Sequence, residues 1–466
     1  MSDPAEPRDP ASGDDRASGP PRDDTAAGAQ PDAGRRGFLL SSAALIAGAY
    51  ASRSTPAGLM APPPPPPPPT PADGTVQPMS APAVPPATEP FYGAHQGGII
   101  TPAQKHTCFA AFDLVTASRS EVIALLQSLT IAAERLSRGQ PAVAAADTQG
   151  PAADSGDVLE LPPARLTITV GFGSGLFNQD GKDRFGLAAQ RPAALVDMPA
   201  FPGDQLVAQW SGGDLSVQAC ADDAPVAFPA VRQLAHLGEG TAQLRWVQNG
   251  FVADFGPNAT VRNLMGFKDG TGNPAVADAR LMDAHVWVGP EGPAWMQGGS
   301  YVLARRSRIA LEHWDRMAVA FQEQTFGRQK RSGAPLGKKL ETDPPDFDAM
   351  DADGNPLIPE NAHVRLAHHL NNDGARILRR SYNYNNGANP VAERWPPWHQ
   401  GLEYDAGLLF VCYQKDPRGG FIKIFTQMAK FDMMNQFVTN LSSSLFACPR
   451  GVQPGEYLGQ HLFKPV

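Results

Sequence analysis

A run of glycines surrounds one carboxylate in the segment from Asn263 to Pro274, NLMGFKDGTGNP. Glycine allows the backbone to turn sharply and to approach a planar or anionic group closely, so Asp269 could carry a proton beside a bound flat molecule. The same spacing also fits a tight turn between two domains, in which Asp269 hydrogen-bonds to its own backbone. Considered alone, the motif favours the turn.

A histidine and an arginine further along the chain form a second candidate group. His363 opens the sequence HVRLA, and Arg379 lies in the sequence RILRRSY. A neutral imidazole can ligate haem iron, and a guanidinium opposite it can stabilise an oxyanion. Any one of the ten histidines is by itself more often structural or solvated than a ligand. The adjacent His368 and His369 fit a non-haem metal poorly, because neighbours on a strand face opposite ways and no third ligand is suitably spaced.

Two similar series of helices and strands are predicted to position these residues. Hydrophobic periodicity, a capping box at Ser118 to Glu121 and alternating patterns place six elements in the first half. Their order is β-α-β-β-α-β, at residues 99–115, 118–138, 165–170, 214–219, 224–237 and 244–251. The second half is predicted to repeat this order, at residues 300–309, 312–324, 376–382, 407–414, 427–441 and 445–448.

This order predicts an α+β fold of two ferredoxin-like halves, each a sheet backed by helices. The halves share negligible sequence identity, so the predicted repeat is one of topology. We expect an N-terminal domain at residues 91–275 and a C-terminal domain at residues 276–466. A stretch with little regular pattern, residues 329–374, interrupts the second half and contains His363. A loop of this length is usually functional or disordered.

The N-terminal region predicts an export signal and a tether. Residues 1–51 carry Arg35-Arg36 and then an apolar run, which is the pattern of a twin-arginine signal. The apolar run is shorter than the roughly 20 residues of a membrane-spanning helix. Small residues before Ser52 indicate cleavage near that position. Residues 52–90, with eight consecutive prolines, predict an extended linker. We therefore expect export in folded form to the periplasm or the cell exterior, with no membrane span after processing.

Composition argues against several classes of protein. The formal net charge of −8 and the 18% of charged residues come without a clustered basic face, so nucleic acid is not an expected partner. The four cysteines lie far apart, without a C-x-x-C or C-x-x-C-H motif. Covalently attached haem, a zinc ribbon and a disulfide scaffold are therefore disfavoured.

Taken together, the motifs resemble those of the dye-decolorizing (DyP-type) peroxidases, and within them the secreted deferrochelatase/peroxidase branch of bacterial iron-uptake systems. The resemblance runs from about Phe91 to the C-terminus and rests on five segments, 91–102, 266–274, 361–367, 377–384 and 408–414. Each motif alone is weak, but their combination is specific. The resemblance implies a dimeric α+β barrel type of fold, with one haem b per subunit between the sheet and the helices of the C-terminal half.

By this resemblance, each matching residue has an implied role. His363 would be the axial ligand of the haem iron. Asp269 and Arg379 would act on the opposite, distal side, as the acid-base residue and the distal arginine. Gly270 and Thr271 would line the haem beside Asp269.

The resemblance is less complete around these residues. Arg365 is a candidate partner for a haem propionate, with an exposed structural salt bridge as the alternative. The related branch has Asn-Pro-Arg in contact with the haem where this chain has His368 to Leu370. A carboxylate behind His363 would strengthen iron ligation, and Asp432 is our candidate.

The resemblance implies a haem-b peroxidase that reduces hydrogen peroxide and oxidises dyes or small phenolic donors. Asp269 would carry the peroxide proton, which predicts a rate optimum below neutral pH, and the fixed charge of Arg379 would stabilise the departing oxygen. Two alternatives stay open: a deferrochelatase that removes iron from haem and leaves protoporphyrin intact, and a haem carrier without turnover. The expected partners are peroxide, small aromatic donors or haem, and iron-uptake proteins; a homo-oligomer stays open.

Overall fold

The computed structural model describes residues 87–143, 156–254, 256, 259–392 and 400–464. They belong to one compact unit, Ser80–Val466. The predicted export signal, residues 1–51, lies outside the described residues, as does most of the predicted linker, residues 52–90. The fold and the site are therefore those of the chain from residue 87 onward.

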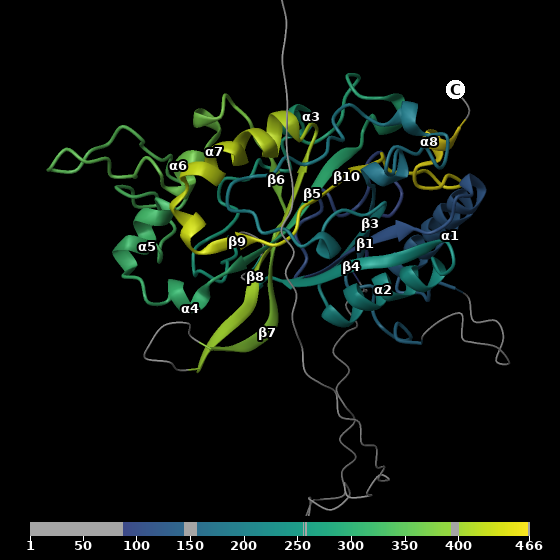
Figure 1. The fold of residues 1–466 in the computed structure, drawn as a ribbon, viewed down its shortest axis with the longest axis horizontal. Helices are drawn as coiled ribbons and strands as arrows, with labels where there is room; N and C mark the ends of the chain where they lie inside the picture. The colour runs from purple at the N-terminus through teal and green to yellow at the C-terminus, as the bar shows by residue number, and fades with distance from the viewer. Residues whose placement is uncertain (1–86, 144–155, 255, 257–258, 393–399, 465–466) are drawn as a thin grey trace, which may run out of the picture. The chain divides into compact units, whose positions relative to one another are not determined.

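The first half of this unit is a four-stranded antiparallel sheet with two helices. Its elements are β1 (His106–Leu114), α1 (Arg119–Ser137), β2 (Thr167–Phe172), β3 (Leu215–Ala221), α2 (Ala224–Leu237) and β4 (Ala242–Phe251), with the short turns η1 (Ser174–Leu176), η2 (Ala188–Gln190) and η3 (Ala208–Trp210). The strand order is β4-β1-β3-β2, and every residue of β2 and β3 is buried. Figure 1 shows α1 and α2 beside β1, β3 and β4. The predicted β-α-β-β-α-β order of the first half is confirmed.

Helix α1 begins where its sequence predicts. The hydroxyl of Ser118 accepts a hydrogen bond from the Glu121 amide at 3.3 Å, which satisfies one of the free amides of the first turn. The predicted apolar stripe is buried, including Val122 and Leu126, each 0% exposed. This stripe packs the helix onto the sheet and excludes water from its inner face.

The second half supplies the remaining strands and most of the helices. Its strands are β5 (Ser300–Ile309), β6 (Leu378–Arg379), β7 (Tyr382–Ala392), β8 (Gln400–Gln414), β9 (Val438–Asn440) and β10 (Ser444–Cys448). Its helices are α3 (Ala279–His285), α4 (Leu311–Trp314), α5 (Val319–Phe326), α6 (His363–Ala367), α7 (Lys423–Phe431) and α8 (Gln460–Phe463), with further helical turns η4 (Ala294–Met296), η5 (His369–Asn371), η6 (Arg418–Ile422) and η7 (Met433–Gln436). Figure 1 shows α5, α6 and α7 grouped on the side away from α1.

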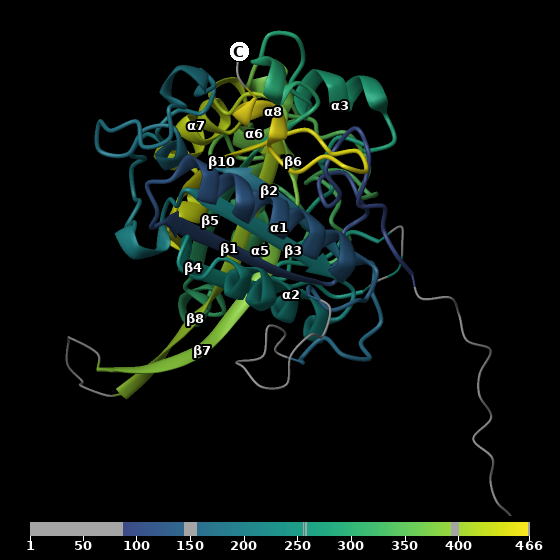
Figure 2. The same ribbon diagram turned by 90° about the vertical axis from the view of Figure 1, so that its right-hand side faces the viewer.

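The sheet closes on itself. Pairing runs β8-β7-β4-β1-β3-β2-β10-β5 and returns from β5 to β8, with β6 and β9 as additional strands. The two halves meet through single residue pairs, Ala447 with Phe172 and Phe251 with Asn383. Figure 2 shows the long β7–β8 ribbon extending away from the helices. This closure, together with the helices on each half, confirms the predicted α+β barrel of two ferredoxin-like halves.

The helix predicted at residues 427–441 was wrong in its position. Helix α7 begins at Lys423 and ends at Phe431. Asp432 ends the helix, because its backbone is extended (φ −66°, ψ 125°) and its carboxylate accepts a hydrogen bond from the Met434 amide, which starts η7. Strand β9 then occupies residues that were expected to be helical. The helix predicted at 312–324 is two short helices, α4 and α5.

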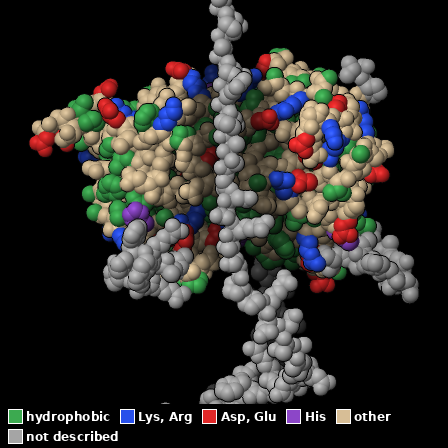
Figure 3. All heavy atoms as spheres, viewed as in Figure 1, with side chains coloured by type: hydrophobic (Ala, Val, Ile, Leu, Met, Phe, Trp, Pro, Cys, Tyr) green, Lys and Arg blue, Asp and Glu red, His purple; other side chains and the backbone are tan. Residues whose placement is uncertain are grey.

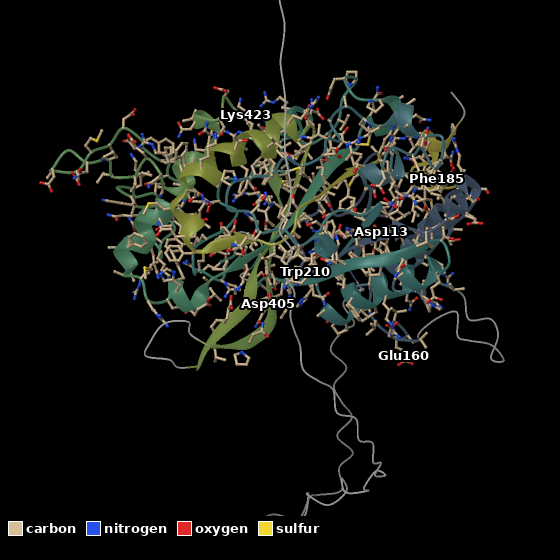
Figure 4. The ribbon with its side chains drawn as sticks, viewed as in Figure 1. Asp113, Glu160, Phe185, Trp210, Asp405 and Lys423 are labelled. Carbon is tan, nitrogen blue, oxygen red and sulfur yellow. The ribbon has the colours of Figure 1, made fainter. Side chains whose placement is uncertain are left out.

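Arg306 of β5 links the two halves. Its guanidinium donates to both carboxylate oxygens of Asp405 on β8, at 2.6 Å each, and lies 4.3 Å from the centroid of the Trp210 ring. Trp210 belongs to η3 in the first half, and Figure 4 shows it in the same region as Asp405. A cation between a carboxylate and an aromatic ring therefore fixes a first-half loop to the second-half sheet.

Within the described residues, no helix combines the length and the apolar character needed to span a bilayer. On the face shown in Figure 3, basic and acidic side chains are interspersed. That face therefore presents no continuous basic surface of the kind that binds nucleic acid.

Arg305 and Asp204 form a buried ion pair between β5 and a first-half loop. Their side chains are 1% and 6% exposed, and the nitrogen and oxygen lie 2.5 Å apart. The Arg305 guanidinium also lies 4.7 Å from the centroid of the Phe425 ring. Each charge is therefore compensated only by its protein neighbours.

We expect Asp204→Ala to lower the free energy of unfolding by about 3–5 kcal/mol, because it leaves Arg305 as an unpaired buried charge. Urea denaturation measures this change. The matched control is Asp197→Ala, which breaks the pair with Arg191 at a carboxylate that is 82% exposed, and it should cost at most about 1 kcal/mol. Equal effects of the two substitutions would contradict the structural difference between the pairs.

Candidate active site

The Gly-rich loop, residues 260–274, places Asp269 against β6. The loop turns tightly, with the Asn263 amide donating to the Phe267 carbonyl at 3.0 Å. Gly270 has a φ of +125°, which residues with a side chain rarely adopt, so the chain changes direction directly after Asp269. Among the described residues, the carboxylate of Asp269 accepts a hydrogen bond from Arg379 and none from its own backbone. The predicted turn is present, and it brings Asp269 to Arg379, the residue that the family resemblance placed on the same side of the site.

Arg379 of β6 faces Asp269. Its Nη1 donates to Oδ1 of Asp269 at 3.2 Å, and the two side chains are 26% and 19% exposed. Asn273 holds the arginine, because its Oδ1 accepts from N and Nε of Arg379 at 3.1 and 3.3 Å and its Nδ2 donates to the Arg379 carbonyl at 2.8 Å. Asn273 was not among the predicted site residues. Its place in the same Gly-rich block was the available signal.

His363 begins α6, and Asp432 orients its imidazole. Nδ1 lies 2.7 Å from Oδ2 of Asp432, whose side chain is 3% exposed and whose Oδ1 accepts from the Met434 amide at 2.8 Å. The carboxylate fixes the ring, and among the described residues Nε2 has no hydrogen-bond partner. The prediction that Asp432 lies behind His363 is confirmed.

Three charged groups act on the pKa of His363. Burial is the largest influence and lowers it, but the charge and the hydrogen bond of Asp432 outweigh burial, so the pKa of His363 lies above its ordinary value. Arg379 lowers this pKa and Asp269 raises it, so both groups lie within electrostatic range of the imidazole. The structure therefore brings together the three residues that were predicted to carry the chemistry.

The arrangement of these groups fits a haem. The His363 side chain is 28% exposed, so neighbouring side chains do not fully enclose the imidazole. The Phe326 ring lies 5.9 Å from the His363 ring and stacks at 3.9 Å on Phe267 of the Gly-rich loop, so aromatic rings connect the imidazole to this loop. An imidazole with a carboxylate behind it is a common iron ligand in haem proteins. The described residues contain no cluster of three or more His, Cys, Asp or Glu that could hold a bare metal ion.

Glu341 was not predicted, and it ties the Gly-rich loop to the long segment that carries His363. Its carboxylate accepts hydrogen bonds from Thr260, Lys268 and Thr271, the last at 2.9 Å. Burial alone would raise the pKa of Glu341, but its bonds to these donors hold the pKa below its usual range. No local pattern could have revealed Glu341, because its partners lie 70 to 81 residues away in the chain.

Arg365 is held by backbone groups. Its Nη1 donates to the carbonyls of Phe347 at 2.8 Å and of Ile358 at 3.1 Å. The alternative of a structural salt bridge is not found among the described residues, where Arg365 makes no ion pair. Its contact with a haem propionate stays a prediction, as does the lining role of Gly270 and Thr271.

Comparison with known proteins identifies the family. The profile described as "Dyp-type peroxidase, N-terminal" matches residues 96–252, and the profile "Dyp-type peroxidase, C-terminal" matches residues 260–453. The chain belongs to the Dyp-type peroxidase family. It is 40% identical over 387 residues to "Dye-decolorizing peroxidase" of Thermobifida fusca, and the aligned region covers 80% of this chain and 84% of the relative. It is 35% identical over 386 residues to "Deferrochelatase" of Escherichia coli O6:K15:H31, at 81% and 87% coverage.

Solved structures of this family have the same fold. Ferric DtpA from Streptomyces lividans matches with a TM-score of 0.72 and 39% identity, over 81% of this chain and 97% of that protein. A DyP-type peroxidase from Cellulomonas bogoriensis matches with a TM-score of 0.72 and 37% identity, over 82% and 99%. The predicted family and the predicted fold are therefore confirmed.

Glu341→Gln tests the link between the Gly-rich loop and the segment that carries His363. We expect a loss of about 1–3 kcal/mol in the free energy of unfolding at pH 7, because Lys268 loses its charged partner. The folded-state pKa of Glu341 is lowered from about 4.5, so its contribution is present above that value and is lost as the pH falls through the lowered pKa. Urea denaturation at pH 7 and pH 3 should therefore show a difference between wild type and variant that shrinks in acid.

Glu239→Gln is the control, at a carboxylate that is 73% exposed and paired with His236. It should change the free energy of unfolding by at most about 0.5 kcal/mol. A Glu341→Gln effect that is the same at both pH values would contradict the role of its charge.

Proposed function

We propose that this protein is a haem-b peroxidase of the DyP type, which reduces hydrogen peroxide and oxidises dyes or small phenolic donors. The observation that carries the proposal is the placement of the Asp269–Arg379 pair within electrostatic range of an imidazole that Asp432 orients. Family membership supports it, and so does DtpA from Streptomyces lividans, which is 38–39% identical and has been solved in ferric and oxyferrous forms.

His363 would hold the haem through Nε2, the nitrogen that Asp432 leaves free. Because the Asp432 carboxylate accepts a hydrogen bond from Nδ1, the imidazole becomes a more basic ligand and its orientation is fixed. Bound haem would supply the redox chemistry that couples peroxide reduction to oxidation of a donor. Phe326 and Phe267 would help to exclude water from the surroundings of His363.

Asp269 would receive the peroxide proton on one oxygen atom and return it to the departing oxygen. Arg379 carries a permanent positive charge and would stabilise the negative charge on that oxygen without reorganising. The hydrogen bonds of Asn273 to N, Nε and the carbonyl of Arg379 keep the guanidinium in place before peroxide arrives. Asp269 and Arg379 also hydrogen-bond to each other, which further restricts the positions of both side chains.

His363→Ala should abolish the Soret band of the purified protein, because it removes the iron ligand. The ultraviolet-visible spectrum of the protein loaded with haemin measures this change. His236→Ala is the control, since His236 is 43% exposed and pairs with Glu239, and it should keep the band. An unchanged Soret band in His363→Ala would refute the assignment of the ligand.

Asp269→Asn should lower the peroxidase turnover rate about 10²–10⁴-fold, because the amide cannot carry the proton. The haem content should stay unchanged, and the wild-type rate should peak below pH 7, as expected for a carboxylate. A pH profile with a phenolic donor measures the turnover rates and the pH optimum, and the Soret absorbance measures the haem content. An unchanged rate would contradict the role of Asp269. A haem carrier would show no turnover in the wild type or in the variant, so absence of a wild-type rate would favour that alternative.

A deferrochelatase is the second candidate, and the relatives of that name that are 35% identical to this chain favour it. Under reducing conditions with haem, iron removal should release free protoporphyrin and its fluorescence. Absence of that fluorescence, with peroxidase turnover intact, would leave the peroxidase as the sole activity of the two.

We further propose that the protein is exported through the twin-arginine pathway to the periplasm or the cell exterior. Arg35-Arg36 and the apolar run after them support this location. Fractionation of cells that express the full chain tests it, and replacement of both arginines by lysine should retain the protein in the cytoplasm.

A further inference from the structure

Four cationic side chains and one exposed leucine gather where residues 327–341 pack against the Gly-rich loop. We call these five residues the Arg331 surface: Arg262, Lys330, Arg331, Lys339 and Leu340. Arg331 and Lys339 are exposed, Leu340 is 63% exposed, and Arg262 and Lys330 are half-buried. None of the five belongs to the site described above.

Two arginines fix the backbone of the Arg331 surface. The guanidinium of Arg262 donates to the carbonyls of Lys330 and Arg331, at 2.7 Å each, and so joins the Gly-rich loop to a segment 68 residues further along the chain. Arg328 donates to the Glu341 carbonyl at 3.0 Å, which brings the chain around residue 340 back to the residues before Arg331. The exposed side chains therefore project from a backbone that is held in place.

The positive ends of the Arg331 surface have no carboxylate partner. In the part of the chain that the structure describes, the side chains of Arg331 and Lys339 make no hydrogen bond or ion pair. Lys330 donates through Nζ to the neutral side-chain amide of Gln322 at 2.6 Å. The guanidinium of Arg262 binds carbonyls, which carry no net charge.

Two carboxylates in these segments bind backbone amides. Glu323 accepts from the Lys330 amide, and Asp343 accepts from the Leu340 amide, at 2.8 Å each. The four cations of the surface outnumber these two carboxylates, although the formal net charge of the whole chain is −8. A local excess of positive charge on an acidic protein attracts an anionic ligand to that place.

The Arg331 surface lies beside Asp269. Glu341 follows Leu340 directly and accepts a hydrogen bond from Thr271 at 2.9 Å. Thr271 is two residues from Asp269, which is roughly 7 Å at most. On the other side, Arg262 directly follows the residue whose carbonyl accepts from the Asp269 amide at 2.8 Å. A molecule bound on this surface would therefore lie next to the loop that carries Asp269.

An aromatic molecule with an anionic group matches this combination of side chains. Guanidinium and ammonium groups form charge-assisted hydrogen bonds to the oxygens of an anion. An exposed leucine gains by covering the apolar surface of a ring. A neutral phenol could use only the apolar part, so the surface distinguishes donors by their charge.

We propose that the Arg331 surface binds anionic aromatic donors, with Arg331 and Lys339 holding the anionic group and Leu340 contacting the ring. This inference rests on the proposed function, because the bound donor is oxidised at the neighbouring site. It makes Arg331 and Lys339 residues that determine specificity, and it leaves the chemistry of peroxide to Asp269 and Arg379.

The double variant Arg331→Gln/Lys339→Gln removes both free charges. We expect KM for a sulfonated anthraquinone dye to rise about three- to tenfold, because each exposed charge pair contributes at most about 1 kcal/mol. KM for a neutral phenol, and kcat with both donors, should stay unchanged. Arg331→Lys alone should keep the low KM for the dye, since the charge remains. Steady-state kinetics with the two donors measures these values.

Binding without peroxide separates docking from turnover. Equilibrium dialysis of the same dye against the haem-loaded protein should give a dissociation constant that rises by the same factor in the double variant. Higher ionic strength should weaken binding of the dye to wild type, because salt screens exposed charges. The double variant, which lacks these charges, should respond less to salt.

Arg138→Gln is the matched control, because it removes the same charge at an arginine of the first half that is 61% exposed, and it should leave both KM values unchanged. An equal rise of KM for the dye and for the phenol in the double variant would overturn the proposal, since the two residues would then act on the Gly-rich loop. An unchanged KM and dissociation constant for the dye would also overturn it, because the donor would then dock elsewhere. Failure of wild type to oxidise either donor, with salt-sensitive dye binding intact, would refute the proposed function and support the docking surface.

Discussion

The hydrogen bond between His363 and Asp432 is the contact on which the rest of the site depends. Asp432 ends α7, caps η7 with one oxygen and holds the imidazole with the other. The position of the helix end therefore sets the direction of the ring. A carboxylate this deeply buried is unfavourable without partners, so the Met434 amide and the imidazole stabilise Asp432 as much as it orients them.

The opposite side of the site is built from a loop, which must be fixed before it can present a carboxylate in one orientation. The Gly-rich loop is fixed on both sides of Asp269. Asn273 binds it to β6, and Glu341 binds Lys268 and Thr271 to the segment that leads to α6. The same bonds that hold Asp269 thus connect the distal side to the part of the chain that supplies the proximal ligand.

The sequence predicted correctly the helices and strands whose bounds depend on local hydrophobic pattern. Helix 224–237 and strand 300–309 have the predicted bounds, because each has strong periodicity and clear ends. The helix at 427–441 was misplaced, because the helix ends at Asp432, which hydrogen-bonds to His363. Hydrophobic periodicity does not detect such a contact. Glu341 was missed for a related reason, since its bonds join residues 70 or more positions apart. Only the combination of motifs, read as a family resemblance, indicated that Asp269, His363 and Arg379 would meet.

Two adjacent arginines show how the first-half sheet supports a site whose three key side chains all follow β4 in the chain. Successive residues of a strand face opposite ways, so Arg379 turns to Asp269 while Arg380 turns to the first half. There Arg380, 6% exposed, donates to the Thr101 carbonyl and to the side chain of Gln104. The first half therefore anchors the strand that carries the distal arginine. Because the halves share only single residue pairs at each seam of the sheet, such side-chain contacts supply much of the rigidity that Arg379 needs to meet a developing charge without moving.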